Sequence, residues 1–268
     1  MSYFNHLLFD IYPYLALAVF LLGSLVRFDR EQYTWKSDSS QLLRLGQLRI
    51  GSNLFHIGIL GLFFGHAVGL LTPHQVYEAL GLSSPAKQML AIVAGGFFGV
   101  LCLIGITLLL HRRLVEPRIR ATSKPMDLII LGWIGVTLLL GLVSIFFSLG
   151  HRDGGVMLQL AAWAQHIVTL RPGAAEALVG VPLIYKVHLF FGMSLFVLFP
   201  FSRLVHVWSG FASVSYLWRN YQVVRRRGQR RPVILKTPSY PRTATAQPKT
   251  AGRTASPEAP VVQLRGGK

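Results

Sequence analysis

The sequence predicts an all-α membrane protein, a bundle of five transmembrane helices with its N-terminus outside and its C-terminus in the cytoplasm. Three observations support this fold class. The 268 residues are 52% hydrophobic and only 14% charged, whereas a soluble domain carries about 25% charged residues. Five apolar stretches approach the roughly 20 helical residues that cross a hydrocarbon core. Basic residues gather in alternate loops, as they do in membrane proteins.

The five stretches are expected to be helices because their apolar runs are continuous, whereas strands of a membrane barrel alternate apolar and polar residues. The N-terminus lacks the basic region of a cleavable signal peptide, so the first run is expected to remain as a helix. Residues Phe4–Phe9 should extend this short run or lie along the interface, and Leu158–Leu170 should form an amphipathic helix at the outer interface. The predicted spans are Ile11–Val26, Leu48–Leu71, Met89–Leu110, Met126–Leu149 and Val181–Trp208.

The distribution of Lys and Arg predicts the orientation of the bundle. The loops after the first and third spans are rich in basic residues, and so is the segment after the fifth span. By contrast, the N-terminus has none, and the loop after the second span has Lys87 alone. The positive-inside rule therefore places the N-terminus outside and the C-terminus in the cytoplasm. An odd number of spans independently requires the two ends to lie on opposite sides.

The net charge of +17 could indicate a nucleic-acid partner, but its distribution does not, and no nucleic acid is expected. Of the 27 Lys and Arg residues, 11 lie in the last 44 positions. We therefore expect two parts, a transmembrane domain over residues 1–224 and a basic, disordered cytoplasmic tail over residues 225–268. Such a tail should stay solvated and approach anionic lipid, although a role in docking a partner stays open.

Several kinds of site are excluded by the residues themselves. The chain has one cysteine, Cys102, so it contains neither an internal disulfide nor a cysteine-ligated iron–sulfur cluster of its own. No Ser/His/Asp grouping, phosphate-binding loop or pair of carboxylates is evident in the sequence. The candidate chemistry therefore rests on histidine.

Four histidines lie within two of the apolar stretches, His56 and His66 in the second and His188 and His206 in the fifth. Ionisable side chains are costly at membrane depth and therefore indicate functional sites. The two spans run antiparallel, so His56 and His206 share the inner depth, and His66 and His188 share the outer depth. Two imidazoles at one depth can clamp an iron porphyrin, and the pattern predicts two stacked haems.

The spacing along the two spans is unequal. His188 and His206 are 18 residues apart, about 27 Å along a helix, whereas His56 and His66 are ten apart, about 15 Å. The difference requires tilted helices, tilted macrocycles or a bend, and Pro200 can kink the fifth span. The remaining histidines are expected to be exposed or interfacial, namely His6, His74, His111, His151 and His166.

Two further groups of residues could serve the haems, and each has a structural alternative. Glycines in the two histidine-bearing spans let a flat macrocycle, or simply a neighbouring helix, approach closely; they are Gly58, Gly61, Gly65 and Gly192. Arginines at the inner surface could bind haem propionates or act only as positive-inside anchors; they are Arg112, Arg113 and Arg203.

A family resemblance is carried by seven stretches between the N-terminus and about Tyr221. They are FDIYPYLALAVFLLGS, EQYTWKSDSSQ, SNLFHIGILGLFFGH, GLLTPH, VLCLIG, HRRLVEPRIRAT and VHLFFGMSLFVLFPFSRLVHVW. Together they resemble the gamma subunit of respiratory nitrate reductase, the membrane cytochrome b that feeds a cytoplasmic molybdenum enzyme. The resemblance includes both histidine-bearing stretches and the loops that connect the spans.

This resemblance implies two b haems and the oxidation of quinol. It assigns His56 and His206 as axial iron ligands of the inner haem, and His66 and His188 as those of the outer haem. A lysine before the third span contributes to the family's quinol site beside the outer haem, close to His66. Lys87, in AKQML, matches that lysine, and a plain positive residue at a helix end is the alternative.

The partners and location follow from the same resemblance. They are a membrane quinol, the lipid bilayer, an iron–sulfur (beta) subunit and a molybdenum catalytic (alpha) subunit on which nitrate itself is reduced. The expected location is the bacterial cytoplasmic (inner) membrane, in which the chain would be a multi-pass protein.

Other functions stay open on the residues alone. A haem b anchor of another quinone-linked complex, such as a heterodisulfide- or sulfite-reducing one, would have the same spans. A non-haem transporter or metal carrier would need acidic residues or broken helices along its pathway, and the spans contain almost no acids. A purely structural anchor without haem is the third alternative.

Overall fold

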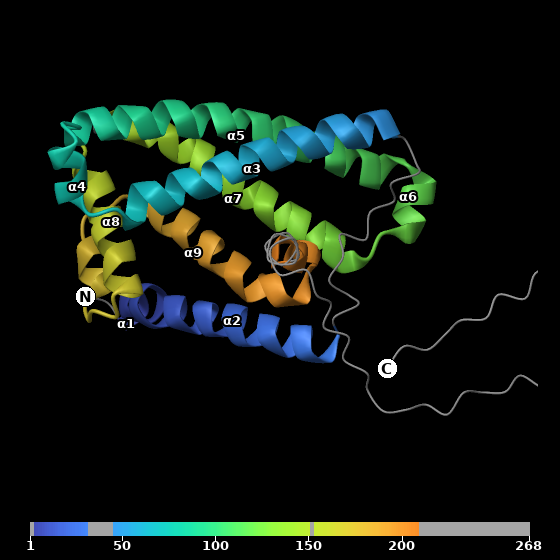
Figure 1. Cartoon of the computed structure of the whole chain (residues 1–268), viewed down its shortest axis with the longest axis horizontal. Coiled ribbons are helices and arrows are strands. Elements are labelled where there is room, and N and C mark those ends of the chain that lie inside the picture. Colours follow the sequence, from blue (N-terminus) through green and yellow to red (C-terminus); the bar gives the residue numbers. More distant parts are fainter. Residues whose placement is uncertain (1–2, 32–44, 151–152, 209–268) are drawn as a thin grey trace, which may run out of the picture. The chain divides into compact units, whose positions relative to one another are not determined.

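The computed structural model describes residues 3–31, 45–150 and 153–208 (Figure 1). The chain divides into two units, Met1–Tyr221 and Gln222–Lys268, and every described residue belongs to the first. The predicted basic tail over 225–268 therefore lies outside the described residues, and the domain boundary at 224 stays a prediction. Within the described ranges every regular element is a helix or a helical turn, which confirms the predicted all-α class.

Five helical segments of the described ranges are long and apolar enough to cross a membrane, as the sequence predicts. The first is continuous over Tyr3–Arg30, so Phe4–Phe9 extend the span. It consists of α1 (Tyr3–His6), the π-helical turn η1 (Leu7–Ile11) and α2 (Tyr12–Arg30). The other spans are α3 (Leu45–Leu71), α5 (Ser84–Val115), α7 (Pro125–Gly150) and α9 (Leu183–Leu198).

The long helices pack in the order α3, α5, α7, α9 and α2, each against the next (Figure 1). The closest approach is between α3 and α5, where glycine is required. A Cβ at Gly58 would lie 2.7 Å from Cα of Cys102, and one at Gly61 would collide with the ring of Phe98. These two glycines therefore serve helix packing, the structural alternative that the sequence left open.

The fifth span differs from the single helix predicted over Val181–Trp208. The helix α9 ends at Leu198, and two 3₁₀ turns follow, η4 (Phe199–Phe201) and η5 (Arg203–Val205). Ser202 between them is extended, with φ −115° and ψ −180°. Because Pro200 has no N–H to continue the helix, the span breaks there instead of kinking. The segment that carries His206 thus takes a new direction.

One face of α2 holds this break in place. Nη1 of Arg27 donates to the carbonyl oxygens of Pro200 and Ser202, at 2.7 Å in both cases. One turn earlier, Gly23 lies against the proline ring, since a Cβ there would be 2.8 Å from Cγ of Pro200. Residues four apart share one face of a helix. This face of α2 therefore packs against the ring of Pro200 and also donates hydrogen bonds to the two carbonyls that the broken helix leaves without partners.

Shorter elements lie at the two ends of the long helices (Figure 1). At one end are α4 (His74–Ala79), α8 (Gly155–Val168) and η3 (Ala174–Leu178), and at the other is α6 (Pro117–Thr122). The helix α8 is the predicted amphipathic helix over Leu158–Leu170, and its apolar side packs on the bundle. Nε1 of Trp163 donates to the carbonyl of Phe9 at 2.9 Å, which fastens α8 to the first span.

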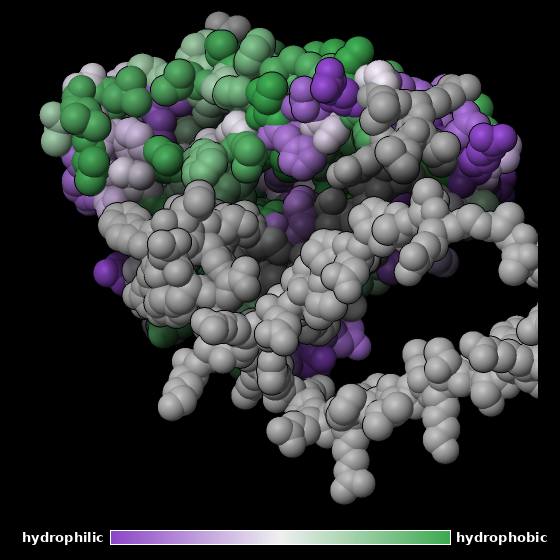
Figure 2. All heavy atoms as spheres, turned by 45° about the vertical axis from the view of Figure 1, so that its right-hand side comes forward, coloured by the Kyte–Doolittle hydropathy of each residue, from purple (hydrophilic) through white to green (hydrophobic). Residues whose placement is uncertain are grey.

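Large apolar side chains are exposed on every long helix, and Figure 2 shows hydrophobic residues over much of the visible face. Examples, one from each of α2, α3, α5, α7 and α9, are Leu22, Phe63, Phe97, Phe146 and Leu183. Such a surface suits lipid tails, while the backbone groups are satisfied inside the helices.

Candidate functional site

The four histidines predicted as iron ligands form two facing pairs between α3 and the fifth span. His56 faces His206, with ring centroids 6.2 Å apart and ring planes at 73°. His66 faces His188, with centroids 6.1 Å apart and planes at 41°. These are the pairs that the antiparallel topology predicts. Within the described ranges, α3 and α9 are not among the closely packed helix pairs, so the imidazoles meet where the two backbones stay apart.

The separation within each pair suits two axial ligands of a single iron. Metal–imidazole nitrogen bonds are about 2 Å long, and the ring centre lies about 1 Å behind the nitrogen, so two opposed imidazoles place their centroids about 6 Å apart. The measured separations of 6.2 Å and 6.1 Å agree with this value. The unequal spacing along the two spans is resolved by the break at Pro200, since His206 lies beyond the change of direction.

All four imidazoles are held by the same kind of hydrogen bond. Each Nδ1 lies close to a backbone carbonyl oxygen, which can only accept, so Nδ1 carries the proton and donates. Nε2 then keeps its lone pair, as a metal-ligating imidazole requires. The accepting carbonyls are those of Ser52 for His56 (2.7 Å), Leu62 for His66 (2.7 Å), Thr137 for His188 (3.1 Å) and Arg203 for His206 (2.6 Å).

Two imidazoles alone are too few ligands to hold a bare metal ion. The described part of the chain contains no group of three or more His, Cys, Asp or Glu side chains that could hold one. A porphyrin supplies four further bonds to its iron, so a set of two histidines is complete with such a macrocycle. The number, spacing and protonation of the imidazoles therefore fit b-type haem.

Glycines near the outer pair differ in what surrounds them. On α7, a Cβ at Gly141 would lie 3.0 Å from Cε1 of His188, so this glycine makes room for the imidazole. A Cβ at Gly65 or Gly192 would meet no atom within 4 Å. Open space beside Gly65 and Gly192 is compatible with the approach of a flat macrocycle, whereas Gly58 and Gly61 are closed by α5.

Two of the arginines predicted at the inner surface, Arg113 and Arg203, lie beside one carboxylate. Asp127, buried in the first turn of α7, lies 3.3 Å from Nη1 of Arg113 and 3.4 Å from Nε of Arg203. Arg112 is also buried. Because Arg203 is three residues before His206, this basic cluster lies beside the inner pair of histidines. Binding of haem propionates by these arginines stays a prediction.

Lys87 lies in the first turn of α5, because this helix begins at Ser84, before the start predicted for the third span at Met89. It is only 4% exposed, and its Nζ lies 3.8 Å from the centroid of the Tyr77 ring. No side chain of the described residues forms an ion pair or a hydrogen bond with this ammonium group. A buried charge without a partner of opposite sign is costly, which points to a ligand and away from a plain helix-end residue.

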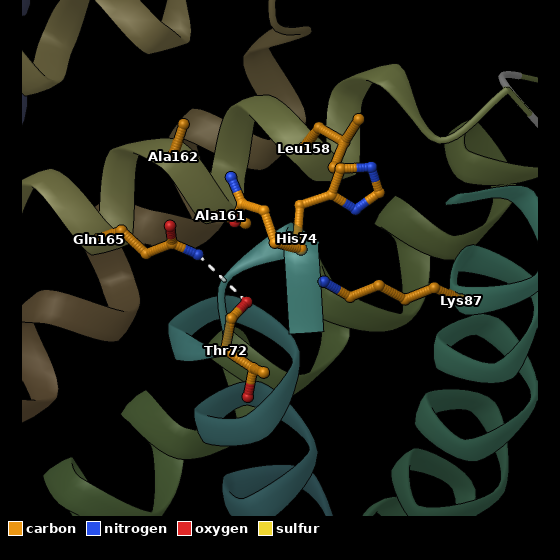
Figure 3. Close-up of a pocket in the computed structure, with 8 residues that line it drawn as sticks. Thr72, His74, Lys87, Leu158, Ala161, Ala162 and Gln165 are labelled. Carbon is orange, nitrogen blue, oxygen red and sulfur yellow. Dashed lines mark hydrogen bonds between the residues drawn. The ribbon is translucent and has the colours of Figure 1, made fainter. Parts of the chain in front are cut away.

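Lys87 lines a cavity of about 130 Å³ formed where α4 and α8 meet the ends of α3 and α5 (Figure 3). Figure 3 shows its ammonium end directed inward among the lining residues. Gln165 of α8 closes one side, since its Nε2 donates to the carbonyls of Leu70 at 3.0 Å and Thr72 at 3.2 Å. The other lining residues are His74, Gln75, Leu158, Ala161 and Ala162.

The helix pairing places Lys87 beyond His66 along the bundle. Gly58 lies opposite Cys102, and the antiparallel course of α3 and α5 then sets Lys87 opposite Pro73, just past the end of α3. That position is seven residues after His66, or about 10 Å along a helix axis. No hydrogen bond or ring contact of the described residues joins Lys87 to His66 directly.

His74 and Tyr77 are the residues of this region that sequence reasoning missed. His74 was expected to be exposed or interfacial; its side chain is 32% exposed at the end of the bundle, and its Nδ1 is buried. His166 on α8 likewise has a buried Nδ1, whereas His6 and His111 are exposed as predicted. His151 lies outside the described residues. The sequence held one sign that His74 has a partner, because His74 and Glu78 are four positions apart and can pair on one face of a helix.

Comparison with known proteins now identifies the family. A sequence family described as "Nitrate reductase gamma subunit" matches residues 5–227. The chain belongs to the nitrate reductase gamma subunit family. This confirms the resemblance predicted from the seven stretches, and the match extends through all five spans.

This nitrate reductase gamma subunit has relatives in Escherichia coli and Bacillus subtilis. It is 53% identical over 227 residues to the respiratory nitrate reductase 1 gamma chain of Escherichia coli (strain K12), a match that covers 85% of this chain and 100% of the relative. The respiratory nitrate reductase 2 gamma chain of the same strain is 52% identical, with 85% and 99% covered. The nitrate reductase gamma chain of Bacillus subtilis (strain 168) is 37% identical over 223 residues, with 83% and 99% covered.

As a nitrate reductase gamma subunit, the chain is one subunit of a nitrate reductase complex and a multi-pass protein of the bacterial cytoplasmic membrane. The family match ends at residue 227, so most of the predicted basic tail lies beyond it.

Proposed function

We propose that this gamma subunit is a dihaem cytochrome b that oxidises membrane quinol near its outer side and passes the electrons inward. The observation that carries the proposal is that the four imidazoles face one another in two pairs, with ring centroids 6.2 Å and 6.1 Å apart. His56 and His206 would hold the inner haem, and His66 and His188 the outer haem. When bound, haem iron supplies reversible one-electron chemistry.

Lys87 would bind the quinol. Its buried ammonium group can donate a hydrogen bond to a quinol oxygen, and its positive charge favours loss of the hydroxyl proton. The distance of about 10 Å from His66 along the helix axis is comparable to the radius of a macrocycle plus one small ring. A quinol bound by Lys87 would therefore lie at the edge of the outer haem.

The direction of transfer rests on the predicted orientation, in which the basic loops face the cytoplasm. Protons would leave on the outer side, and electrons would pass to the iron–sulfur (beta) subunit and then to the molybdenum (alpha) subunit, where nitrate becomes nitrite. The names of the relatives, gamma chains of nitrate reductases, support such an assembly. Moving one electron inward across the whole membrane costs about 2.3 kcal/mol per 100 mV of negative-inside potential.

Arginines would fix the propionates of the inner haem. Asp127 pairs with both Arg113 and Arg203, and Arg203 is three residues before His206. Arg112 is buried and is next to Arg113 in the chain. Guanidinium groups bind carboxylates with strong charge-assisted hydrogen bonds. These arginines would thus hold the macrocycle at the depth that the two inner imidazoles require.

The test is a reduced-minus-oxidised spectrum with a haem assay on the purified complex. Two b haems for each gamma subunit are expected. His66→Ala should remove the outer haem and quinol oxidation, whereas His6→Ala, which alters an exposed histidine, should leave both haems in place. A His66→Ala complex with two haems and full quinol-dependent nitrate reduction would overturn the ligand assignment.

The same preparation separates the other functions that the sequence left open. A haem-free anchor or a transporter would show no b-type bands. A haem b anchor of a different reductase would show the bands but would co-purify without molybdenum and without nitrate reductase activity. Metal analysis of the co-purified complex therefore decides between the two classes of partner.

A further inference from the structure

His74 carries a ring nitrogen that forms no hydrogen bond with any residue that the structure describes. Its Nδ1 is buried, and no described residue forms a hydrogen bond with it. On the other side of the ring, Nε2 lies 3.1 Å from Oε1 of Glu78 and 3.4 Å from Oγ of Ser84. Because a carboxylate can only accept, Nε2 carries the proton and donates to Glu78, which leaves the lone pair on Nδ1.

The pair connects the cavity with the surface. His74 lines the same cavity as Lys87 (Figure 3), while the side chain of Glu78 is 62% exposed. The two are four residues apart on α4 and share one face of that helix. One end of the pair therefore lies at the proposed quinol site, and the other reaches the surface at this end of the bundle.

The site needs a base, and the other lining residues do not supply one. Lys87 as an ammonium group holds three protons and cannot accept another. The lining residues that α8 contributes are uncharged, and those from the α3–α4 connection and α4, apart from His74, are Thr72 and Gln75, which are not bases near neutral pH. Among the described lining residues, His74 alone carries an imidazole, and its unpartnered Nδ1 can accept a proton.

We propose that His74 is the proton acceptor for quinol oxidation and that Glu78 is its outlet to the outer aqueous phase. The inference rests on the proposed function and assigns two residues within that site. An O–H bond of the quinol breaks, and its proton bonds to Nδ1 of His74 while the proton on Nε2 passes to Glu78 and then to water. The electron from the same oxygen would pass to the outer b haem, the group that His66 and His188 would hold. Two such transfers convert the quinol to quinone, with two protons and two electrons released.

Lys87 and His74 thus have different roles at the same quinol hydroxyl. The ammonium group stabilises the oxygen as negative charge develops, and the imidazole removes the proton. Removal of Lys87 should weaken binding, whereas removal of the imidazole should slow the reaction with binding retained. This difference makes the role of His74 measurable apart from that of Lys87.

The experiment uses the complete complex with His74→Gln, His74→Ala or Glu78→Gln in the gamma subunit. The rate of haem reduction by menadiol is followed by stopped flow across a range of pH, and a fluorescent redox-inactive quinol analogue reports binding. General base catalysis typically contributes 10²–10⁴-fold, so His74→Gln should slow haem reduction at least about tenfold. Both haems and the analogue affinity should stay within about twofold of the unmodified values. Glu78→Gln should slow it less, because water can replace the outlet.

Chemical rescue separates proton transfer from a structural role. The cavity of about 130 Å³ can admit imidazole from solution, so added imidazole should raise the rate of His74→Ala and leave the unmodified complex unchanged. His6→Gln is the matched control, because His6 forms a pair of the same spacing with Asp10, at 2.6 Å, away from the cavity. Its rate and its pH profile should equal those of the unmodified complex.

The possible outcomes test the role of His74 separately from the proposed oxidation of quinol. Variants of His74 that reduce the haems as fast as the unmodified complex at every pH would overturn the inference and leave the proposed function intact. So would a loss of analogue binding or of haem that matches the loss of rate, because His74 would then be structural. If the unmodified complex does not reduce its haems with quinol, the proposed function itself is wrong.

Discussion

The ammonium group of Lys87 lies 3.8 Å from the centroid of the Tyr77 ring, and the hydroxyl of Tyr77 donates to the carbonyl of Val68 at 2.6 Å. Val68 is two residues after His66 on α3. Tyr77 therefore links the buried cation to the turn that follows a proposed ligand of the outer haem. A desolvated cation over an aromatic ring gains about 2 kcal/mol. The ring of Tyr77 therefore helps to hold the ammonium group of Lys87 in the cavity, where a quinol can contact it.

Replacing Tyr77 should therefore weaken quinol binding without loss of haem. Tyr77→Leu removes the ring and the hydroxyl. We expect the quinol KM and the dissociation constant of a quinol analogue to rise about tenfold to thirtyfold, since a loss of about 2 kcal/mol corresponds to about thirtyfold. Tyr77→Phe keeps the ring and should cost only about threefold. Tyr3→Leu alters an 80% exposed tyrosine and serves as the control. Unchanged analogue affinity in Tyr77→Leu would show that the ring does not position Lys87.

Lys87 itself should affect binding more strongly than its aromatic neighbour. Lys87→Ala removes the charged donor from the cavity, and a hydrogen bond to a charged group is worth about 1.5–3 kcal/mol, so the affinity for quinol should fall about tenfold to a hundredfold. Both haem spectra should be retained, because Lys87 touches neither histidine pair. Equilibrium binding of the analogue to purified complexes measures the effect. Lys124→Ala, in the connection between α6 and α7, serves as the control. Equal affinity in Lys87→Ala would remove this residue from the quinol site.

Hydrophobic length and charge distribution were enough to predict the spans, because the bilayer selects long continuous apolar runs. The pairing of His56 with His206 and of His66 with His188 was predictable for a similar reason. Antiparallel neighbours bring residues of equal depth together, whatever the details of side-chain packing. The orientation relative to the two sides of the membrane stays a prediction, since the structure contains no membrane.

The break in the fifth span could not be predicted from the span itself. Pro200 alone is compatible with a kinked helix, and what stabilises the break is Arg27, far away in the sequence on α2. The cavity beside Lys87 was missed for the same physical reason. It is lined by residues of α4, α5, α8 and the α3–α4 connection, and α4, with only six residues, is too short to show a periodic pattern. Long-range contacts of this kind leave no local signal in the sequence.

Gly141 gives a specific way to disturb the outer pair of histidines. A Cβ at this position would lie 3.0 Å from Cε1 of His188, so Gly141→Ala should push the imidazole by a few tenths of an ångström. Overpacking of this kind typically costs about 1–3 kcal/mol. We expect a shifted midpoint potential and an altered electron paramagnetic resonance signal for the outer haem, with the inner haem unchanged.

Gly132→Ala is the matched control for this substitution. It lies on the same helix, and a Cβ there would meet no atom within 4 Å, so both haem signals should be those of the unmodified complex. The prediction is contradicted if Gly141→Ala shifts the inner haem instead, or shifts both haems by the same amount. Either result would show that His188 is not a specific ligand of the outer haem.

Arg27 should support the inner haem although it touches neither of its proposed ligands. The two carbonyls that it satisfies, those of Pro200 and Ser202, lie within six residues of His206. An unsatisfied buried polar group costs about 1–3 kcal/mol, and the break would relax to satisfy these carbonyls in another way. Arg27→Ala should thus displace His206, lower the occupancy of the inner haem and leave the outer haem bound. Haem quantitation with separate low-spin signals for the two haems measures the effect.

The alternative is that Arg27 acts only as a positive charge at the cytoplasmic surface, as the positive-inside rule would suggest. Arg30→Ala removes the same charge from the same helix, but Arg30 is exposed, so under our interpretation this variant keeps both haems. Arg27→Lys retains the charge and loses the two-carbonyl geometry of the guanidinium. If charge were the cause, Arg27→Lys would behave like the unmodified protein and Arg30→Ala like Arg27→Ala. If the break is what matters, Arg27→Lys loses inner haem and Arg30→Ala does not, because only Arg27 reaches the carbonyls that α9 leaves open.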